Sequence, residues 1–132
     1  MIKAVIFDMF ETLISYHICP VYFGTQMAEE ATRIRRSELF PYFDVVCFSN
    51  EQGICKPEKE IYHRCVEALS VQLEECLYVG DGGSRELETA QELGMKVVQA
   101  TWYLKDGTSQ PVGRISEFEE ARRPMDVVEF VK

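Results

Sequence analysis

The sequence lacks the features that mark membrane, redox or nucleic-acid-binding proteins. Its 132 residues contain no apolar run near the roughly 20 residues of a membrane span, and its five cysteines include no C-x-x-C pair. Basic residues are few, since 14 Lys and Arg stand against 22 Asp and Glu, for a formal charge of −8. That balance argues against general binding to nucleic acids or membrane surfaces. We therefore expect a cytoplasmic protein whose cysteines are reduced and serve as small packing residues.

The composition that is present suits one ordinary domain. A hydrophobic content of 46% can build a globular core, and a chain of this length buries roughly two-thirds of its unfolded surface. No internal repeat, low-complexity segment or inter-domain linker interrupts the chain. We interpret residues 1–132 as a single core domain.

Short apolar runs alternate with helical patterns along the chain. The predicted strands are Ala4 to Phe7, Asp44 to Phe48, Glu75 to Val79 and Met95 to Ala100. The predicted helices are Gln26 to Leu39, Pro57 to Ser70, Ser84 to Leu93 and, at the end, Pro124 to Val131. The run "EFEEARR", from Glu117 to Arg123, is interpreted as a solvated helical face. The alternation predicts an α/β fold, a three-layer, Rossmann-like open parallel sheet.

Polar side chains follow three of the predicted strands. Asp8, Ser49 and Asp81 each stand one residue beyond an apolar run. Ligands bind at the carboxyl ends of the strands in open parallel sheets. We therefore expect a functional site at that edge of the sheet.

Three segments in a fixed order carry a family resemblance: "FDMFETL", "GICKPEKEIY" and "YVGDGGSRELETAQELGM". Together they resemble the haloacid dehalogenase-like (HAD) hydrolase superfamily, from Lys3 to about Trp102. The resemblance implies a Mg²⁺-dependent hydrolase, in the first place a phosphatase that acts on a small phosphorylated metabolite. It carries no indication of the oligomeric state.

The resemblance also implies roles for individual residues. Asp8 would attack phosphorus and form an aspartyl-phosphate, and Lys56 would neutralise the nucleophile and the transferring group. Asp8, Asp81 and the backbone carbonyl of Phe10 would bind Mg²⁺. Glu86 would hold a metal-bound water or orient Lys56. In the alternative interpretation Asp8 caps a turn, Lys56 is a solvated residue before a helix, and "GDGG" is a simple turn.

Two further residues are placed near the site with supporting roles. Thr12 lies in the turn after the first strand. Ser49 is interpreted as a loop residue at the edge of the site, because it stands too close to Lys56 to be the phosphate-binding serine of the family.

Phe10 is the first departure from the family pattern. Phosphatases of the family usually carry a second aspartate here as general acid and base, help that is typically worth 10²–10⁴-fold in rate. Phenylalanine has no exchangeable proton. This leaves open a 2-haloacid dehalogenase-type hydrolase, or a catalytically impaired protein of this fold that binds a metal or another ligand.

The second departure is the absence of a cap domain and of one core strand. Only about 30 residues separate Leu13 from Asp44, too few for a crossover helix, a buried strand and a cap. The gap would leave an unfilled place beside the nucleophile strand, where unpaired backbone groups are costly. We expect an internal segment to be missing near residues 28–36, or else a minimal protein in which another segment or a second chain fills the gap.

Overall fold

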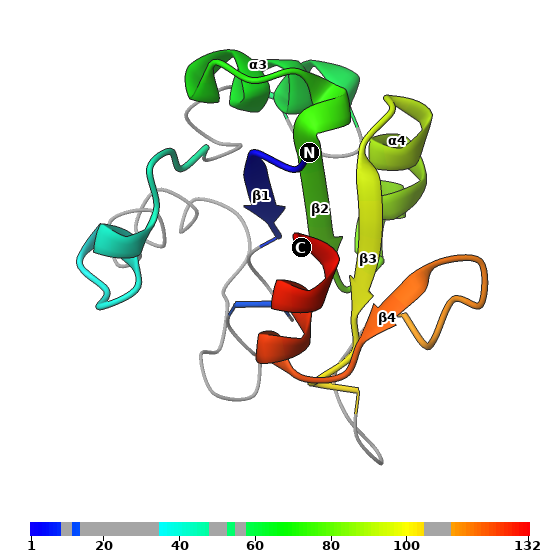
Figure 1. Cartoon of the computed structure of the whole chain (residues 1–132). Helices are drawn as coiled ribbons and strands as arrows, with labels where there is room; N and C mark the ends of the chain where they lie inside the picture. Colours follow the sequence, from blue (N-terminus) through cyan, green and yellow to red (C-terminus); the bar gives the residue numbers. More distant parts are fainter. Residues whose placement is uncertain (9–11, 14–34, 48–52, 55–57, 105–111) are drawn as a thin grey trace.

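The structure, a computed structural model, describes residues 1–8, 12–13, 35–47, 53–54, 58–104 and 112–132. Four strands form one parallel sheet in the order β1-β2-β3-β4 (Figure 1). They are β1 (Ala4–Phe7), β2 (Cys76–Gly80), β3 (Lys96–Ala100) and β4 (Glu119–Ala121). The predicted α/β class with an open parallel sheet is therefore confirmed.

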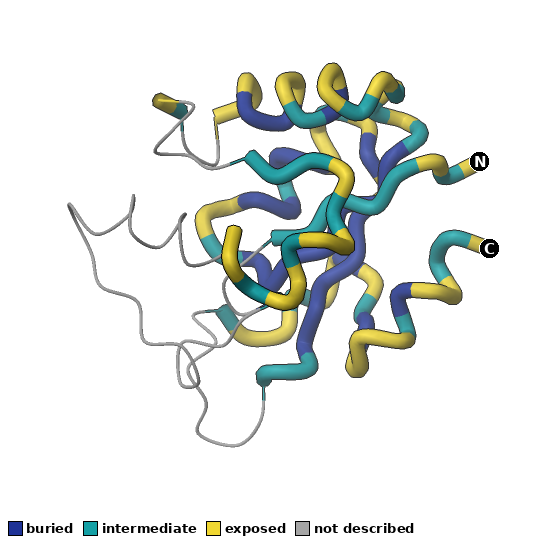
Figure 2. The backbone as a smooth tube through the Cα atoms, turned by 90° about the vertical axis from the view of Figure 1, so that its left-hand side faces the viewer, coloured by how far each residue is buried: buried dark blue, intermediate teal, exposed yellow. Residues whose placement is uncertain are grey.

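Both faces of the sheet are covered, which gives the three predicted layers. On one face, Tyr78 of β2 packs in a cluster with residues of helices α3 (Lys59–Leu69) and α4 (Glu86–Glu92). On the other face, Leu77 of β2 packs in a second cluster with Val127 of the 3₁₀ segment η4 (Pro124–Phe130). Successive residues of a strand point to opposite faces, so β2 contributes to both cores. The buried residues accordingly gather in the strands at the centre of the molecule (Figure 2).

The helices end where the sequence supplies a left-handed backbone position. Gly94 follows α4 with a φ of 99°, as its place in the sequence predicts. Ser70 has the same role after α3, with a φ of 56°. Helix α3 begins at Lys59 rather than at Pro57, and the last predicted helix is a 3₁₀ segment. Apart from this 3₁₀ segment, element types are as predicted in these regions, and only the ends differ.

Two predictions about secondary structure are wrong. Residues 44–47, the described part of the predicted strand Asp44 to Phe48, form neither strand nor helix. A β-branched segment becomes a strand only when a neighbour completes its hydrogen bonds, and no described strand lies beside it. The run "EFEEARR" is no helical face, because β4 lies within it and pairs with β3. Its charged residues suit a short edge strand.

Strand β1 lies at an edge of the described sheet and is only half-buried along its length, whereas β2 is fully buried. The predicted helix Gln26 to Leu39 and the expected join near residues 28–36 lie mostly outside the described residues. The missing segment therefore stays a prediction. Within the described residues, no helix combines the length and apolarity of a membrane crossing.

Candidate active site

Asp8 and Asp81 follow two neighbouring strands at the carboxyl edge of the sheet. Residues 4–7 of β1 pair in register with residues 76–79 of β2. The pairing continues one residue further, because the Asp8 N–H donates to the Val79 carbonyl at 2.8 Å. Parallel pairing thus brings Asp8 beside the end of β2, where Asp81 begins the next turn.

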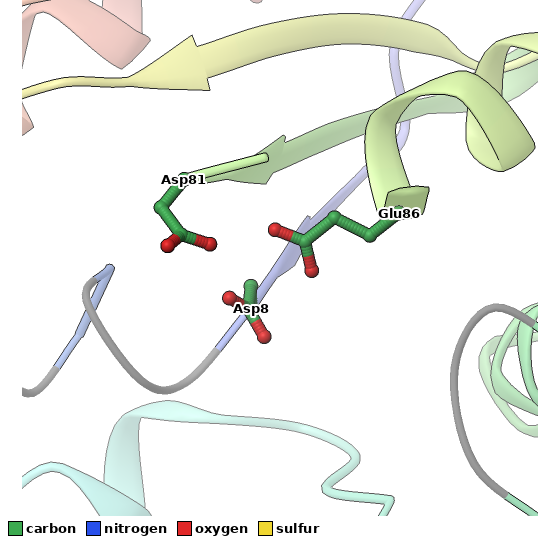
Figure 3. A group of neighbouring side chains, drawn as sticks. All are labelled: Asp8, Asp81 and Glu86. Atoms are coloured by element: carbon green, nitrogen blue, oxygen red, sulfur yellow. The ribbon is translucent and has the colours of Figure 1, made fainter. Parts of the chain in front are cut away.

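A turn with left-handed backbone positions connects Asp81 to helix α4. Gly82 has a φ of 103°, and Ser84 and Arg85 have φ values of 56° and 53°. Non-glycine residues in this region cost of order 1–3 kcal/mol each. The Gly83 N–H donates to Asp81 Oδ1 at 3.2 Å. The turn allows α4 to begin at Glu86 with its side chain directed back to the end of β2 (Figure 3).

Asp8, Asp81 and Glu86 form one carboxylate cluster. One oxygen from each lies within 4.8 Å of the others, and the three side chains converge from β1, the β2 end and α4 (Figure 3). Asp81 and Glu86 are buried, at 3% and 0% exposure. Buried carboxylates this close repel one another unless protons or a cation compensate their charge. An all-oxygen donor set suits a hard divalent cation such as Mg²⁺.

Glu86 is held by hydrogen bonds to both oxygens of its side chain and to its backbone carbonyl. The Gly82 N–H donates to Oε1 at 3.1 Å, and the Tyr78 hydroxyl donates to Oε2 at 3.0 Å. The Tyr62 hydroxyl donates to the Glu86 backbone carbonyl at 3.1 Å. The side chain also lies against Gly80, where an added Cβ would be 2.5 Å from Glu86 Oε1. Residues from α3, β2 and the turn therefore determine where this carboxylate points.

The electrostatics of the cluster favour protonation when no cation is present. Burial, and then the neighbouring Glu86 and Asp8, raise the pKa of Asp81 to about 8. Burial is also the main cause that raises the pKa of Tyr78 well above its usual range, with the Glu86 charge next. Tyr78 therefore keeps its proton and acts as a donor to Glu86. A bound cation would favour the ionised form of the carboxylates.

The backbone of Asp81 is fixed from the other side by Gln99 of β3. Gln99 is fully buried, and its amide nitrogen donates to the Asp81 carbonyl at 3.0 Å and to the Gly113 carbonyl at 2.9 Å. Its oxygen accepts from the Ile115 N–H at 2.8 Å and from Arg114 at 3.1 Å. One side chain thus connects the acidic end of β2 to residues 113–115.

Of the residues predicted from sequence, the structure brings together Asp8, Asp81 and Glu86. Thr12 is buried at 2% exposure, and its backbone carbonyl accepts from Trp102 Nε1 at 2.8 Å. The Thr12 hydroxyl is buried with no hydrogen-bond partner among the described residues. Three others, Phe10, Ser49 and Lys56, lie outside the described residues.

The sequence reasoning missed Tyr78 and Gln99. A signal for both was available, since each is a polar residue inside an otherwise apolar strand next to a predicted site. A buried hydroxyl or amide needs hydrogen-bond partners. Asking where those partners lie would have pointed to the carboxyl edge of the sheet.

A parallel α/β sheet with clustered carboxylates at its carboxyl edge is an arrangement used by hydrolases among other enzymes. The sequence model of the haloacid dehalogenase-like hydrolase family matches residues 18–94, more than half of the chain. The chain belongs to this family.

Two curated relatives and one solved structure illustrate the similarity. The chain is 34% identical over 67 residues to glyceraldehyde 3-phosphate phosphatase of Methanocaldococcus jannaschii, a match that covers 51% of this chain and 29% of the relative. It is 32% identical over 75 residues to mouse N-acylneuraminate-9-phosphatase, covering 54% of this chain and 29% of the relative. The structure of a HAD phosphatase from Thermococcus onnurineus superposes with a TM-score of 0.63 at 24% identity, covering 77% of this chain and 45% of that one. The matches thus span under a third of the length of these curated relatives.

Proposed function

We propose that this chain carries the catalytic core of a Mg²⁺-dependent phosphatase that acts on a small phosphorylated metabolite. The observation that carries the proposal is the convergence of Asp8 with Asp81 and Glu86 at the carboxyl edge of the sheet. Membership of the hydrolase family supports it, as do the phosphatase names of two relatives. The formal charge of −8 leaves nucleic acids and membranes as poor partners.

In the proposed reaction Asp8 is the nucleophile. One Asp8 oxygen forms a bond to phosphorus while the bond from phosphorus to the ester oxygen breaks, and the departing oxygen takes a proton from water. A second water then attacks phosphorus, which releases inorganic phosphate and restores the Asp8 carboxylate. Lys56 is assigned to neutralise charge on the transferring group, a role that rests on its place in the sequence.

The metal is assigned to Asp8 and Asp81, with the Phe10 carbonyl as the third protein ligand and Glu86 in support. The donor chemistry fits Mg²⁺, because oxygens of three acidic side chains lie within 4.8 Å of one another. A bound Mg²⁺ would supply positive charge to offset that of the phosphoryl oxygens. Asp81 and Glu86 are buried and hydrogen-bonded, so their carboxylates would already be oriented before the ion binds.

Phe10 favours substrates with a good leaving group, because no acid stands there to protonate the departing oxygen. The same residue supports a second candidate, a 2-haloacid dehalogenase-type hydrolase. In that reaction an Asp8 oxygen would displace halide from carbon, and halide needs no proton to leave. A catalytically impaired binding protein is the third candidate, and the following experiment distinguishes it from the phosphatase and the dehalogenase.

The test is a panel of phosphate esters, including an aryl phosphate, given to the complete protein with Mg²⁺. We expect release of inorganic phosphate from the aryl ester, and loss of that release in Asp8→Asn with the fold retained by circular dichroism. Glu129→Gln is the control, because it removes one exposed carboxylate in the C-terminal segment. Chloride release from 2-haloacids without phosphate release would favour the dehalogenase. Neither product from a protein that binds Mg²⁺ would favour the binding protein.

We also propose that one core strand and a cap belong between β1 and the segment at residues 44–47. The half-burial of β1, against the full burial of β2, supports this, because an internal strand of a parallel sheet is normally covered on both sides. The intact mass of the protein is the test. A mass above 15.2 kDa supports additional residues, and a mass equal to it supports a minimal form.

A further inference from the structure

Glu86 is the member of the carboxylate cluster whose two side-chain oxygens both accept hydrogen bonds from described donors. Its side chain is fully buried, and each of its two oxygens accepts a hydrogen bond from a different element. Gly82 provides a backbone donor to Oε1, and Tyr78 provides a side-chain donor to Oε2. This carboxylate faces Asp8 and Asp81, and one oxygen from each of the three side chains lies within 4.8 Å of the others.

We propose that Tyr78 is a positioning residue for the cation site, which acts by holding the Glu86 carboxylate in the orientation that faces Asp8 and Asp81. This inference rests on the proposed function, since it assumes that the cluster binds a divalent cation. Tyr78 packs with residues of α3 and α4 on one face of the sheet, and its hydroxyl donates to Glu86 Oε2.

Packing around the ring restricts the position of the Tyr78 hydroxyl. The Tyr78 side chain is 3% exposed, and its ring lies 5.5 Å from the ring of Tyr62, tilted by 47°. Burial against the α3 and α4 residues leaves the ring little freedom. A donor that cannot move fixes its acceptor, and partners that orient metal ligands in this way typically change metal affinity 10–100-fold when removed.

Tyr62 provides a matched comparison on the neighbouring ring. Its hydroxyl also donates to Glu86, but to the backbone carbonyl and not to the side chain. Tyr62→Phe and Tyr78→Phe therefore each remove one buried hydroxyl that bonds to the same residue. Only Tyr78→Phe releases a carboxylate oxygen, so only that variant is expected to alter the orientation of the Glu86 carboxylate.

The experiment measures the Mg²⁺ dissociation constant of the complete protein by isothermal titration calorimetry, without substrate. Urea unfolding in EDTA reports the metal-free stability of each variant. We expect Tyr78→Phe to weaken Mg²⁺ binding at least tenfold and Tyr62→Phe to change it less than threefold, although both lose stability. This readout does not depend on turnover.

Three results would overturn the inference, and they differ in what else they affect. Unchanged Mg²⁺ affinity in Tyr78→Phe would show that the hydroxyl serves stability alone. Equal weakening in both variants would show a general loosening of α4 rather than control of the carboxylate. No Mg²⁺ binding by the unsubstituted protein would overturn the inference together with the proposed metal site.

Discussion

Gly80 is the position where one added methyl group would most directly disturb the carboxylate cluster. It is the last residue of β2, and a Cβ built there would lie 2.5 Å from Glu86 Oε1, 2.9 Å from Glu86 Cδ and 3.1 Å from Tyr78 Cε1. Its φ is not in the left-handed region, so the effect of Gly80→Ala is steric and not conformational. Real Cβ atoms essentially never approach other atoms within 3.0 Å, so Glu86 must move.

The cost of that movement follows from the bonds that Glu86 makes. The carboxylate ends a flexible side chain, but it is fully buried and accepts from Tyr78 and from the Gly82 N–H. Overpacking costs typically about 1–3 kcal/mol, and a buried donor left without its acceptor costs about 1–3 kcal/mol more. We expect Gly80→Ala to lower the free energy of unfolding by about 2–6 kcal/mol and to weaken Mg²⁺ binding at least tenfold.

The assay is urea unfolding followed by the fluorescence of Trp102, the only tryptophan, with calorimetric titration of Mg²⁺ on the folded protein. Gly113→Ala is the matched control, because a Cβ there meets nothing within 4 Å and its φ is not positive. We expect the control to stay within about 0.5 kcal/mol of the unsubstituted protein. The same small change in Gly80→Ala, with unaltered Mg²⁺ affinity, would refute the reasoning.

Four further predictions concern pH, backbone strain, the core and the surface. Since the pKa of Asp81 is raised to about 8, the metal-free protein should lose stability as pH rises from about 4 through 8. The loss should reach up to about 1.4 kcal/mol per pH unit for each proton released on unfolding. Urea midpoints measured in EDTA at several pH values would show this trend, and saturating Mg²⁺ should oppose it. Ser84→Gly should raise the unfolding free energy by about 1 kcal/mol, because Ser84 has a φ of 56°, and a lower urea midpoint would contradict this. Leu77→Ala should cost about 2–5 kcal/mol in the same assay, since Leu77 is fully buried, and a loss under 1 kcal/mol would contradict the described core. Lys59→Ala should change stability by less than about 1 kcal/mol, because its ion pair with Glu92 is exposed, with side-chain exposures of 58% and 59%.

Much of the fold could be predicted because its signals are local. The runs that became β1, β2 and β3 are apolar and bounded by turn residues, so their type and nearly their ends follow from the sequence. Strand β4 was missed because its three residues, two of them glutamates, carry no apolar pattern. The strand predicted at Asp44 to Phe48 was wrong in its described part, because a strand depends on a distant partner as well as on its own residues.

The candidate site, like the fold, was predictable from the sequence only in part. Asp8 and Asp81 were predicted together because parallel strands align their carboxyl ends, a geometric rule that needs no coordinates. The orientation of Glu86 was beyond the sequence, because it depends on left-handed positions at non-glycine residues in the turn before α4. Local propensity does not favour those positions, and the turn forms where α4 packs against β2 and β3.

The sequence by itself therefore determined the parallel α/β class, the edge of the sheet at which the acidic residues gather, and the family. Only the tertiary structure decided that Tyr62 donates to the Glu86 backbone and that Gln99 fixes the Asp81 backbone. The physical reason is separation along the chain. Hydrogen bonds such as those from Tyr62 to Glu86 and from Gln99 to Asp81 join residues 24 and 18 positions apart, and such partners meet only when the sheet and its helices have packed.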